Sequence, residues 1–252
     1  RSGVVTTAIL GETGVQYVIV KFQFLGATDR TFHYLFFVRK DLGLGNIEKL
    51  RAYSGLRLGA ISIGHTGYTY SRTFAWLLGL KDPKFVLGYS SIELDAAVLR
   101  GEVDARSNNS TEIVRRNLGA LKEDSPIDFI SILKIPREDK EPNFDHLPEL
   151  DNFAKSDKER RFLALARATR SVGTPYLIPP GTPKELVQIL RNAMKKTFQD
   201  PEFHKEFKKL SGEDPTPLMP EAQEDLIRAV PRDAETIELF KLINGNQPLP
   251  PR

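Results

Sequence analysis

The feature that most constrains this chain is a glycine-broken turn between a strand pattern and a helix pattern. The turn runs from Gly59 to Gly67, after an apolar strand pattern at 56–58 and before a helix pattern at 68–78. Backbone N–H groups at a helix start have no intrahelical partner, and the helix dipole adds positive potential there. His65 and Thr66 add side-chain donors at the same point. The sequence therefore predicts an anion site here, and we expect the anion to be a carboxylate.

Strand patterns alternate with helix patterns along most of the chain. The alternation predicts an α/β fold with largely parallel strands, and no internal repeat is visible. The segments 107–111 and 136–150 are polar or proline-rich and are expected to form loops. Strands are expected at 17–25, 33–39, 56–58, 84–87, 103–106, 129–135 and 174–178, and helices at 46–53, 68–78, 92–100, 111–118, 157–171, 183–198 and 201–211.

Helix ends and helix faces can be predicted in the same way. Thr182 is expected to cap the helix that Pro183 opens, with Glu185 completing a capping box. Asp200 is expected to cap the next helix, and Gly212 to end it. Apolar residues at helical spacing are expected to face the core: Ile113, Val114, Leu118, Leu186, Ile189, Leu190, Ala193, Phe198, Phe203, Phe207 and Leu210.

Composition excludes several classes of function. The 252 residues carry a net charge of +3, and basic residues alternate with acidic ones, which argues against nucleic-acid binding. The chain has no cysteine, so disulfides, thiolate catalysis and cysteine metal sites are excluded. The four histidines lack metal-ligand spacing, and we expect neither a metal nor a cofactor. No apolar run approaches the roughly 18 residues of a membrane span.

One segment offers an alternative function. Gly88-Tyr89-Ser90-Ser91-Ile92 contains the first glycine and the serine of a nucleophile elbow, with Ile92 in place of the second glycine. A hydrolase-like enzyme acting on a small ester or acid through Ser90 is therefore the alternative to a binding protein. Its test is the loss of ester turnover in Ser90→Ala.

Four motifs, in order over much of the chain, resemble a known family. They are the Gly59–Gly67 turn, a strand that ends in Gly88-Tyr89, the element Arg100-Gly101-Glu102-Val103-Asp104, and Pro179-Pro180-Gly181-Thr182-Pro183 opening a helix. Asp200-Pro201-Glu202-Phe203 and Gly212-Glu213-Asp214-Pro215 follow. Together they resemble the receptors of tripartite tricarboxylate transporters, a bacterial family of extracytoplasmic carboxylate-binding proteins.

The resemblance implies a two-lobed clamshell of the type II periplasmic-binding class, with mixed sheets flanked by helices. Lobe one would comprise 1–40 and 173–252, and lobe two 41–172. It also implies a periplasmic, non-enzymatic monomer that captures a small organic carboxylate and presents it to membrane permease subunits. A carboxylate sensor that docks on a signalling partner is the other role compatible with the family. The family's first strand and its glycine-rich loop have no match here, so lobe one is expected to be incomplete at its N-terminus.

The resemblance also indicates candidate ligand contacts. Tyr89 is either a wall of the cleft or a core residue, and Asp104 is either a contact through a ligand hydroxyl or a structural acceptor. Arg106 and Asn108 are either carboxylate ligands or residues of a solvated loop; the planar guanidinium of Arg106 suits a carboxylate. His65 stands where the family usually has a small Ser or Thr. The complete set is Ser62, Gly64, His65, Thr66, Gly67, Tyr89, Asp104, Arg106, Asn108 and, from lobe one, Thr28.

Overall fold

The computed structural model describes residues 4–11, 16–116, 121–122, 124–212 and 214–252. The chain divides into two compact units, each described here by itself. Unit 1 comprises Arg1–Phe32 and Ala164–Ile237, and unit 2 comprises His33–Leu163 and Glu238–Arg252. These units differ from the predicted lobes at three segments: 33–40 and 238–252 belong to unit 2, and 164–172 belongs to unit 1.

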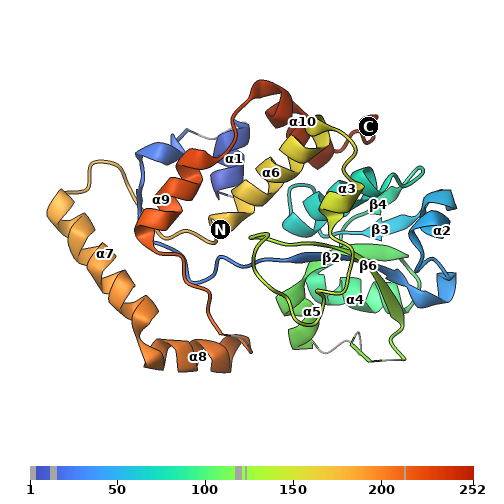
Figure 1. Cartoon of the computed structure of the whole chain (residues 1–252), viewed down its shortest axis with the longest axis horizontal. Coiled ribbons are helices and arrows are strands. Elements are labelled where there is room, and N and C mark those ends of the chain that lie inside the picture. Colours follow the sequence, from blue (N-terminus) through green and yellow to red (C-terminus); the bar gives the residue numbers. More distant parts are fainter. Residues whose placement is uncertain (1–3, 12–15, 117–120, 123, 213) are drawn as a thin grey trace. The chain divides into compact units, whose positions relative to one another are not determined.

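Unit 2 is built on a five-stranded mixed sheet with the order β4-β3-β5-β2-β6 (Figure 1). The strands are β2 (Tyr34–Arg39), β3 (Arg57–Gly59), β4 (Lys84–Val86), β5 (Ala105–Asn109) and β6 (Ile127–Leu133). β3 pairs in parallel with β4 and β5, whereas β2 pairs antiparallel with β5 and β6. The prediction of largely parallel strands is therefore wrong for β5, β2 and β6. The strand β2 comes from a different part of the chain and runs antiparallel to both of its neighbours.

The apolar sequence of strand β2 follows from its position in the sheet, where both of its faces are covered. Tyr34 and Phe36 face α3 (Thr66–Leu78), where their rings stack on Tyr70 and Phe74 at 3.8 and 5.5 Å between centroids. The alternate residues Leu35 and Phe37 join the core cluster on the other face, with α4 (Ser91–Leu99) and α5 (Ser110–Arg116). A strand covered on both faces has no solvent side, so its sequence is apolar throughout instead of alternating.

Helix caps of unit 2 follow the sequence closely. The Asn46 side chain caps α2 (Ile47–Ala52), and Gly79 ends α3 in the left-handed conformation with φ 73°. Ser90 and Glu93 form a reciprocal capping box at the start of α4. Leu118, expected on the inner face of the helix after Ser110, lies outside the described residues.

The polar segment expected as a loop at 107–111 is instead partly a strand. Residues 107–109 extend β5, and 110–111 begin α5. The register explains why, because Ser107 and Asn108 are paired with Phe36 and Leu35 in the middle of the sheet. A buried strand of polar residues carries no hydrophobic signal, so periodicity could not identify it.

Unit 1 contains a two-stranded antiparallel sheet of β1 (Gln23–Phe24) and β7 (Leu177–Ile178). The predicted strand 17–25 is wrong over most of its length, because the backbone closes a 3-10 turn at Ile19–Lys21 before β1 begins. The predicted strand 174–178 is likewise shorter. Its helices are α1 (Val4–Leu10), α7 (Lys184–Gln199), α8 (Pro201–Ser211) and α9 (Pro220–Ala229), and two further helices, α6 (Asp157–Ser171) and α10 (Ala234–Asn244), continue from one unit into the other.

The α7–α8 pair departs from prediction in its cap and in its apolar face. The Thr182 hydroxyl donates to the Pro179 carbonyl, and Pro183 is the N-cap, so the predicted capping box is absent. Val187 and Phe198 are the buried residues of α7, so the prediction is confirmed for Phe198, whereas other side chains expected inward are exposed. These are Leu186, Ile189 and Leu190 on α7, and Leu210 on α8, which is 82% exposed. The amphipathic period was read correctly, but no described element covers that face.

A proline-rich C-terminal segment lies along α3 in unit 2. The Trp76 indole donates to the Pro250 carbonyl at 2.9 Å, and the Tyr68 hydroxyl donates to the Gly245 carbonyl at 2.7 Å. Arg252 at the end of the chain forms an ion pair of 2.7 Å with the buried Glu159. The segment is therefore fixed along its whole length by polar contacts to residues far away in the sequence.

The buried His33 gives unit 2 a specific pH dependence. Its Nδ1 accepts from the Ile135 N–H at 2.8 Å, and its Nε2 is buried without a partner among the described residues. Burial lowers the pKa of His33, although Glu141 and Asp139 oppose the effect. A lowered pKa means that protonation favours the unfolded state, so this stability is present above the ordinary value of about 6.5 and is lost as the pH falls below it.

We expect the free energy of unfolding to fall with pH below about 6.5, by at most about 1.4 kcal/mol per pH unit from this residue. His33→Asn keeps an acceptor for the Ile135 N–H but does not titrate, so it should flatten the slope while lowering stability at every pH. Urea unfolding of both proteins between pH 5 and 8 measures the two slopes. Parallel curves would contradict the assignment.

Candidate functional site

A small pocket in unit 2 brings the glycine-broken turn to the polar end of β5. The cavity has a volume of about 120 Å³. Its walls come from the turn after β3, the start of α3, the start of α4, and β5 with the start of α5. The lining residues are Tyr34, Gly59, Ala60, Ile61, His65, Thr66, Gly67, Ser91, Leu94, Arg106, Ser107, Asn108, Asn109 and Glu112.

The turn forms the start of α3 in an unusual way. Gly64 has φ 79°, a left-handed conformation that favours glycine, and it places His65 at the N-cap. His65 Nδ1 accepts from the Gly67 N–H at 3.1 Å, so an imidazole does what a Ser or Asp oxygen usually does. A ring nitrogen can accept only when it carries no proton. Burial and the charge of Arg106 lower the pKa of His65, which favours this neutral form, while Glu112 acts in the opposite direction.

Three side chains of β5 have polar atoms without a partner among the described residues. They are Arg106 Nε, Ser107 Oγ and Asn108 Nδ2. Their residues are 3%, 1% and 5% exposed. The Asn108 amide is oriented because its Oδ1 accepts from the Asn109 N–H at 2.9 Å, which leaves its NH₂ group free. A buried donor without an acceptor costs about 1–3 kcal/mol. Arg106 and Asn108 share one face of β5 and Ser107 lies on the other, and all three residues line the cavity, which marks this end of β5 as a candidate site for an acceptor ligand.

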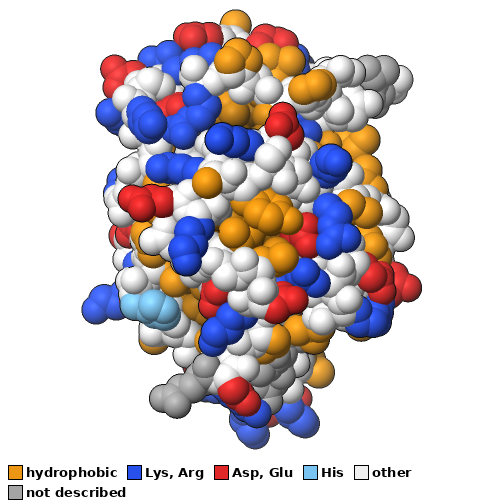
Figure 2. Space-filling model, turned by 90° about the vertical axis from the view of Figure 1, so that its right-hand side faces the viewer, with side chains coloured by type: hydrophobic (Ala, Val, Ile, Leu, Met, Phe, Trp, Pro, Cys, Tyr) orange, Lys and Arg blue, Asp and Glu red, His pale blue; other side chains and the backbone are white. Residues whose placement is uncertain are grey.

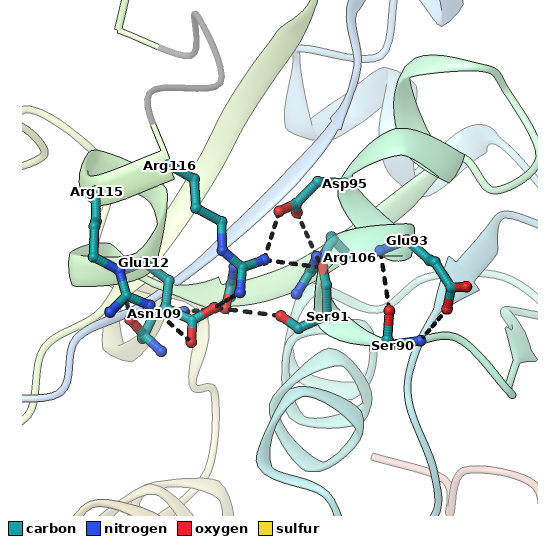
Figure 3. A network of polar contacts seen from close by, with 10 residues as sticks. Ser90, Ser91, Glu93, Asp95, Arg106, Asn109, Glu112, Arg115 and Arg116 are labelled. Carbon is teal, nitrogen blue, oxygen red and sulfur yellow. Dashed lines mark hydrogen bonds and ion pairs between the residues drawn. The ribbon is translucent and has the colours of Figure 1, made fainter.

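Arg106 is held in place by an ion-pair network (Figure 3). Its Nη1 bonds Asp95 and also donates to the Ser91 carbonyl at 3.2 Å. Arg116 approaches the same Asp95 carboxylate at 2.8 Å and Glu112 at 2.9 Å. Burial lowers the pKa of Arg106 and Asp95 opposes this, yet a guanidinium remains charged in proteins. The network therefore fixes a buried cation whose Nε is free.

Five of the predicted site residues line this pocket: His65, Thr66, Gly67, Arg106 and Asn108. Ser62 and Gly64 are exposed parts of the same turn and do not line it. Tyr89 packs against the core cluster beneath α4. Thr28 belongs to unit 1.

Asp104 has a structural environment instead of a pocket position. Arg57 binds both of its carboxylate oxygens, at 2.6 and 2.9 Å, and Arg39 lies 3.8 Å away. Burial alone raises the pKa of Asp104, but the hydrogen bonds and charges of the two arginines outweigh it and hold the pKa below its usual value. Both oxygens are thus engaged, and none is left for a ligand.

Several residues of the pocket and of the ion-pair network behind it are not predicted from the sequence. Ser107 and Asn109 fall in the expected loop, Ser91 and Glu112 line the pocket without being candidates, and Asp95 and Arg116 belong to the network. The pairing of Glu112 with Arg116 at i, i+4 was a visible signal, because such pairs form on helices. Their link to Asp95 joins two helices and could not be derived from spacing.

A larger cavity of about 570 Å³ lies between α3 and the C-terminal segment. Its buried donors are already satisfied, because Arg72 and Trp76 donate to carbonyls of that segment. We therefore place the functional site in the smaller cavity, where donors are free. In the described part of the chain, no group of three His, Asp or Glu side chains could hold a metal ion. None of the described helices combines the length and apolarity needed to span a bilayer.

No family model and no curated protein matches this sequence. Solved structures do match the fold. A TctC solute-binding protein from Polaromonas superposes over 95% of this chain and 74% of its own, with a TM-score of 0.61 and 16% identity. The periplasmic binding protein BugD matches over 96% of this chain and 76% of its own, with a TM-score of 0.63 and 17% identity.

The chain has the fold of a periplasmic solute-binding protein. MatC from Rhodopseudomonas palustris, solved with bound malate, covers 95% of this chain and 75% of its own length at a TM-score of 0.59 and 17% identity. The resemblance noted in the sequence is therefore confirmed for the fold. At these identities the binding-protein fold does not transfer a ligand, and the pocket's own chemistry must indicate one.

The imidazole cap of this binding-protein fold can be tested by substitution. His65→Ala removes the acceptor for the Gly67 N–H and is expected to lower stability by about 1 kcal/mol. His65→Asn supplies a side-chain oxygen, a preferred N-cap, and should retain stability. Urea unfolding at pH 7.5 compares the three proteins. Equal stability of the alanine and asparagine variants would show that the cap contributes nothing.

Proposed function

We propose that this protein is a non-enzymatic receptor that captures a small organic carboxylate outside the cytoplasm and presents it to a membrane permease. The observation that carries the proposal is a cavity lined by Arg106, Ser107 and Asn108, three residues with buried polar atoms that have no partner among the described residues. A carboxylate offers about four acceptor positions and one negative charge, so it satisfies these donors and the cation together. The fold shared with solute-binding proteins supports the same function.

The charge distribution of the surface supports a small ligand over a polyanion. On the face shown in Figure 2, Lys and Arg side chains are interspersed with Asp and Glu. A nucleic-acid site would require a continuous basic surface, whereas the cation proposed here is a single buried guanidinium.

The hydrolase alternative is less favoured by the geometry. The Ser90 hydroxyl accepts from the Glu93 N–H at 3.3 Å, and Glu93 in turn accepts from the Ser90 N–H at 2.7 Å. Ser90 is thus a helix cap, and no histidine in the described part of the chain hydrogen-bonds to it. A serine nucleophile needs a base within such reach.

Isothermal titration calorimetry of the complete gene product against mono-, di- and aromatic carboxylates tests the proposal. A thermal shift with the same panel is the independent second measurement. We expect binding of at least one acid, released heat, and a raised melting temperature. If no acid in the panel produces either signal, the proposed function is wrong.

Thr66→Val gives a local test, because Thr66 is the first residue of α3 and lines the pocket. Loss of its hydroxyl donor should weaken carboxylate binding by about 1–3 kcal/mol. Thr197→Val on α7, whose hydroxyl bonds its own helix, is the matched control and should bind normally. Unchanged affinity of the Thr66 variant would exclude this hydroxyl as a ligand contact.

A further inference from the structure

The acceptors around the pocket are as informative as its free donors. Glu112 is the carboxylate that lines the cavity, and it is already bound by Arg116 at 2.9 Å and by the Ser91 hydroxyl at 3.3 Å, with Arg115 at 3.9 Å. Asp95, behind it, is shared between Arg106 and Arg116. No carboxylate at the described pocket is left for a positively charged group of a ligand.

The amide oxygens are engaged in the same way. Asn108 Oδ1 accepts from the Asn109 N–H at 2.9 Å, and Asn109 Oδ1 accepts from the Glu112 N–H at 2.8 Å. The fixed groups that remain are donors, namely Arg106 Nε and Asn108 Nδ2, and the hydroxyl of Ser107 can donate as well. A ligand of this pocket therefore needs hydrogen-bond acceptors, because the pocket itself offers few.

The local charge balance points in the same direction. Three guanidiniums, those of Arg106, Arg115 and Arg116, surround two carboxylates, Asp95 and Glu112. One positive charge is left in excess beside the cavity. An ammonium group within about 4 Å of a buried guanidinium is repelled strongly, since the effective dielectric there is well below that of water.

We infer that the pocket selects a short carboxylate whose neighbouring carbon bears a hydroxyl, keto or hydrogen substituent, and rejects the corresponding amino acid. The inference rests on the proposed carboxylate-receptor function and specifies its ligand class. A hydroxyl has two lone pairs to accept from the free donors, whereas an ammonium has three donors and no acceptor. The cavity of about 120 Å³ holds the volume of roughly four water molecules, enough for a carboxylate and its first carbons.

L-malate and L-aspartate are the probes, because they have the same carbon chain and differ by a hydroxyl in place of an ammonium. Succinate, which has neither, separates charge from size. Calorimetry on the complete protein should give a dissociation constant at least tenfold lower for malate than for aspartate. If aspartate binds as tightly as malate, the inference is overturned while the proposed function stands. If no carboxylate binds, the proposed function fails first.

Arg116→Gln tests the mechanism of the discrimination. The substitution removes the partner of Asp95 Oδ2 and leaves Glu112 Oε2 with the Ser91 hydroxyl alone, so acceptor capacity appears near the pocket and the excess charge disappears. The preference for malate over aspartate should shrink by tenfold or more, mainly through tighter aspartate binding. Arg100→Gln removes an exposed arginine paired with Glu102 and should leave the preference unchanged. A preference that is unchanged in Arg116→Gln would contradict the role of the network. If this variant folds poorly, the comparison of malate with aspartate on the unsubstituted protein still tests the inference.

Discussion

Replacing Arg72 by methionine is expected to destabilise unit 2 by about 3 kcal/mol, and to release the C-terminal segment from α3. Arg72 is 2% exposed, and its guanidinium faces carbonyls instead of a carboxylate. Its Nε donates to the Ile243 carbonyl, and its Nη2 donates to Leu242 and Gln247 at 3.4 and 2.6 Å. Leu242 and Ile243 lie in the last turn of α10, whose carbonyls have no partner within the helix. The arginine therefore caps a helix C-terminus with a positive charge, where the dipole favours it.

A buried arginine is not stabilising by default, because burial lowers its pKa and replacement of a buried charge by an apolar residue can be neutral. Here two observations argue for a net loss. The carbonyls that Arg72 satisfies lose their donor, and leaving a buried one unsatisfied costs about 1–3 kcal/mol, which favours release of the segment. The guanidinium also lies over the Phe85 ring at 4.8 Å, a contact that methionine recovers only in part.

The only tryptophan of the chain reports this directly. Trp76 bonds the same segment through Pro250, so release of the segment should change its fluorescence before unit 2 unfolds in urea. Arg72→Lys keeps the positive charge but has a single ammonium group instead of a planar guanidinium. Its stability should fall between those of the original protein and Arg72→Met. An Arg72→Met protein within about 0.5 kcal/mol of the original, with unchanged fluorescence, would show that the cap is dispensable.

The anchoring of this segment shows what sequence reasoning could reach. The local rules were sufficient for Asp200 and Gly212, because a cap or a left-handed glycine acts within four residues of its own position. The same rules could not show that Arg72 meets Gln247, since the two are 175 residues apart and share no periodic pattern.

The candidate site also contains residues that local sequence rules predict and residues that they do not. The turn that starts α3 was predicted from glycine spacing and helix-start chemistry, and His65, Thr66 and Gly67 do line the pocket. Ser107 and Asn109 were assigned to a loop, because a polar strand in the middle of a sheet violates the usual pattern. Such violations are expected at functional sites, where stability is given up for binding groups. The Thr182 prediction failed for a different reason: its hydroxyl donates to the Pro179 carbonyl instead of acting as the N-cap acceptor, and no sequence pattern ranks these two local roles.

Arg106→Met is expected to weaken carboxylate binding by about 2–3 kcal/mol, or roughly 30- to 150-fold. The variant loses the free Nε donor and the one buried cation whose guanidinium lines the cavity, while methionine keeps most of the side-chain volume. Asp95 retains Arg116 at 2.8 Å, so its carboxylate is not left unpaired. The affinity should therefore fall much further than the stability.

The matched variants separate charge from hydrogen-bond geometry. Arg106→Lys restores a cation but lacks the planar guanidinium, whose Nη1 bonds Asp95 while its Nε has no partner among the described residues, so we expect it to recover part of the affinity. Arg100→Met removes a surface arginine of the same unit and should bind as the original does. Calorimetry measures the affinities, and circular dichroism with temperature verifies that each variant is folded. If Arg106→Met is folded and binds its carboxylate with unchanged affinity, the ligand lies elsewhere in the molecule, because Arg106 is the one Lys or Arg among the described residues that line this pocket.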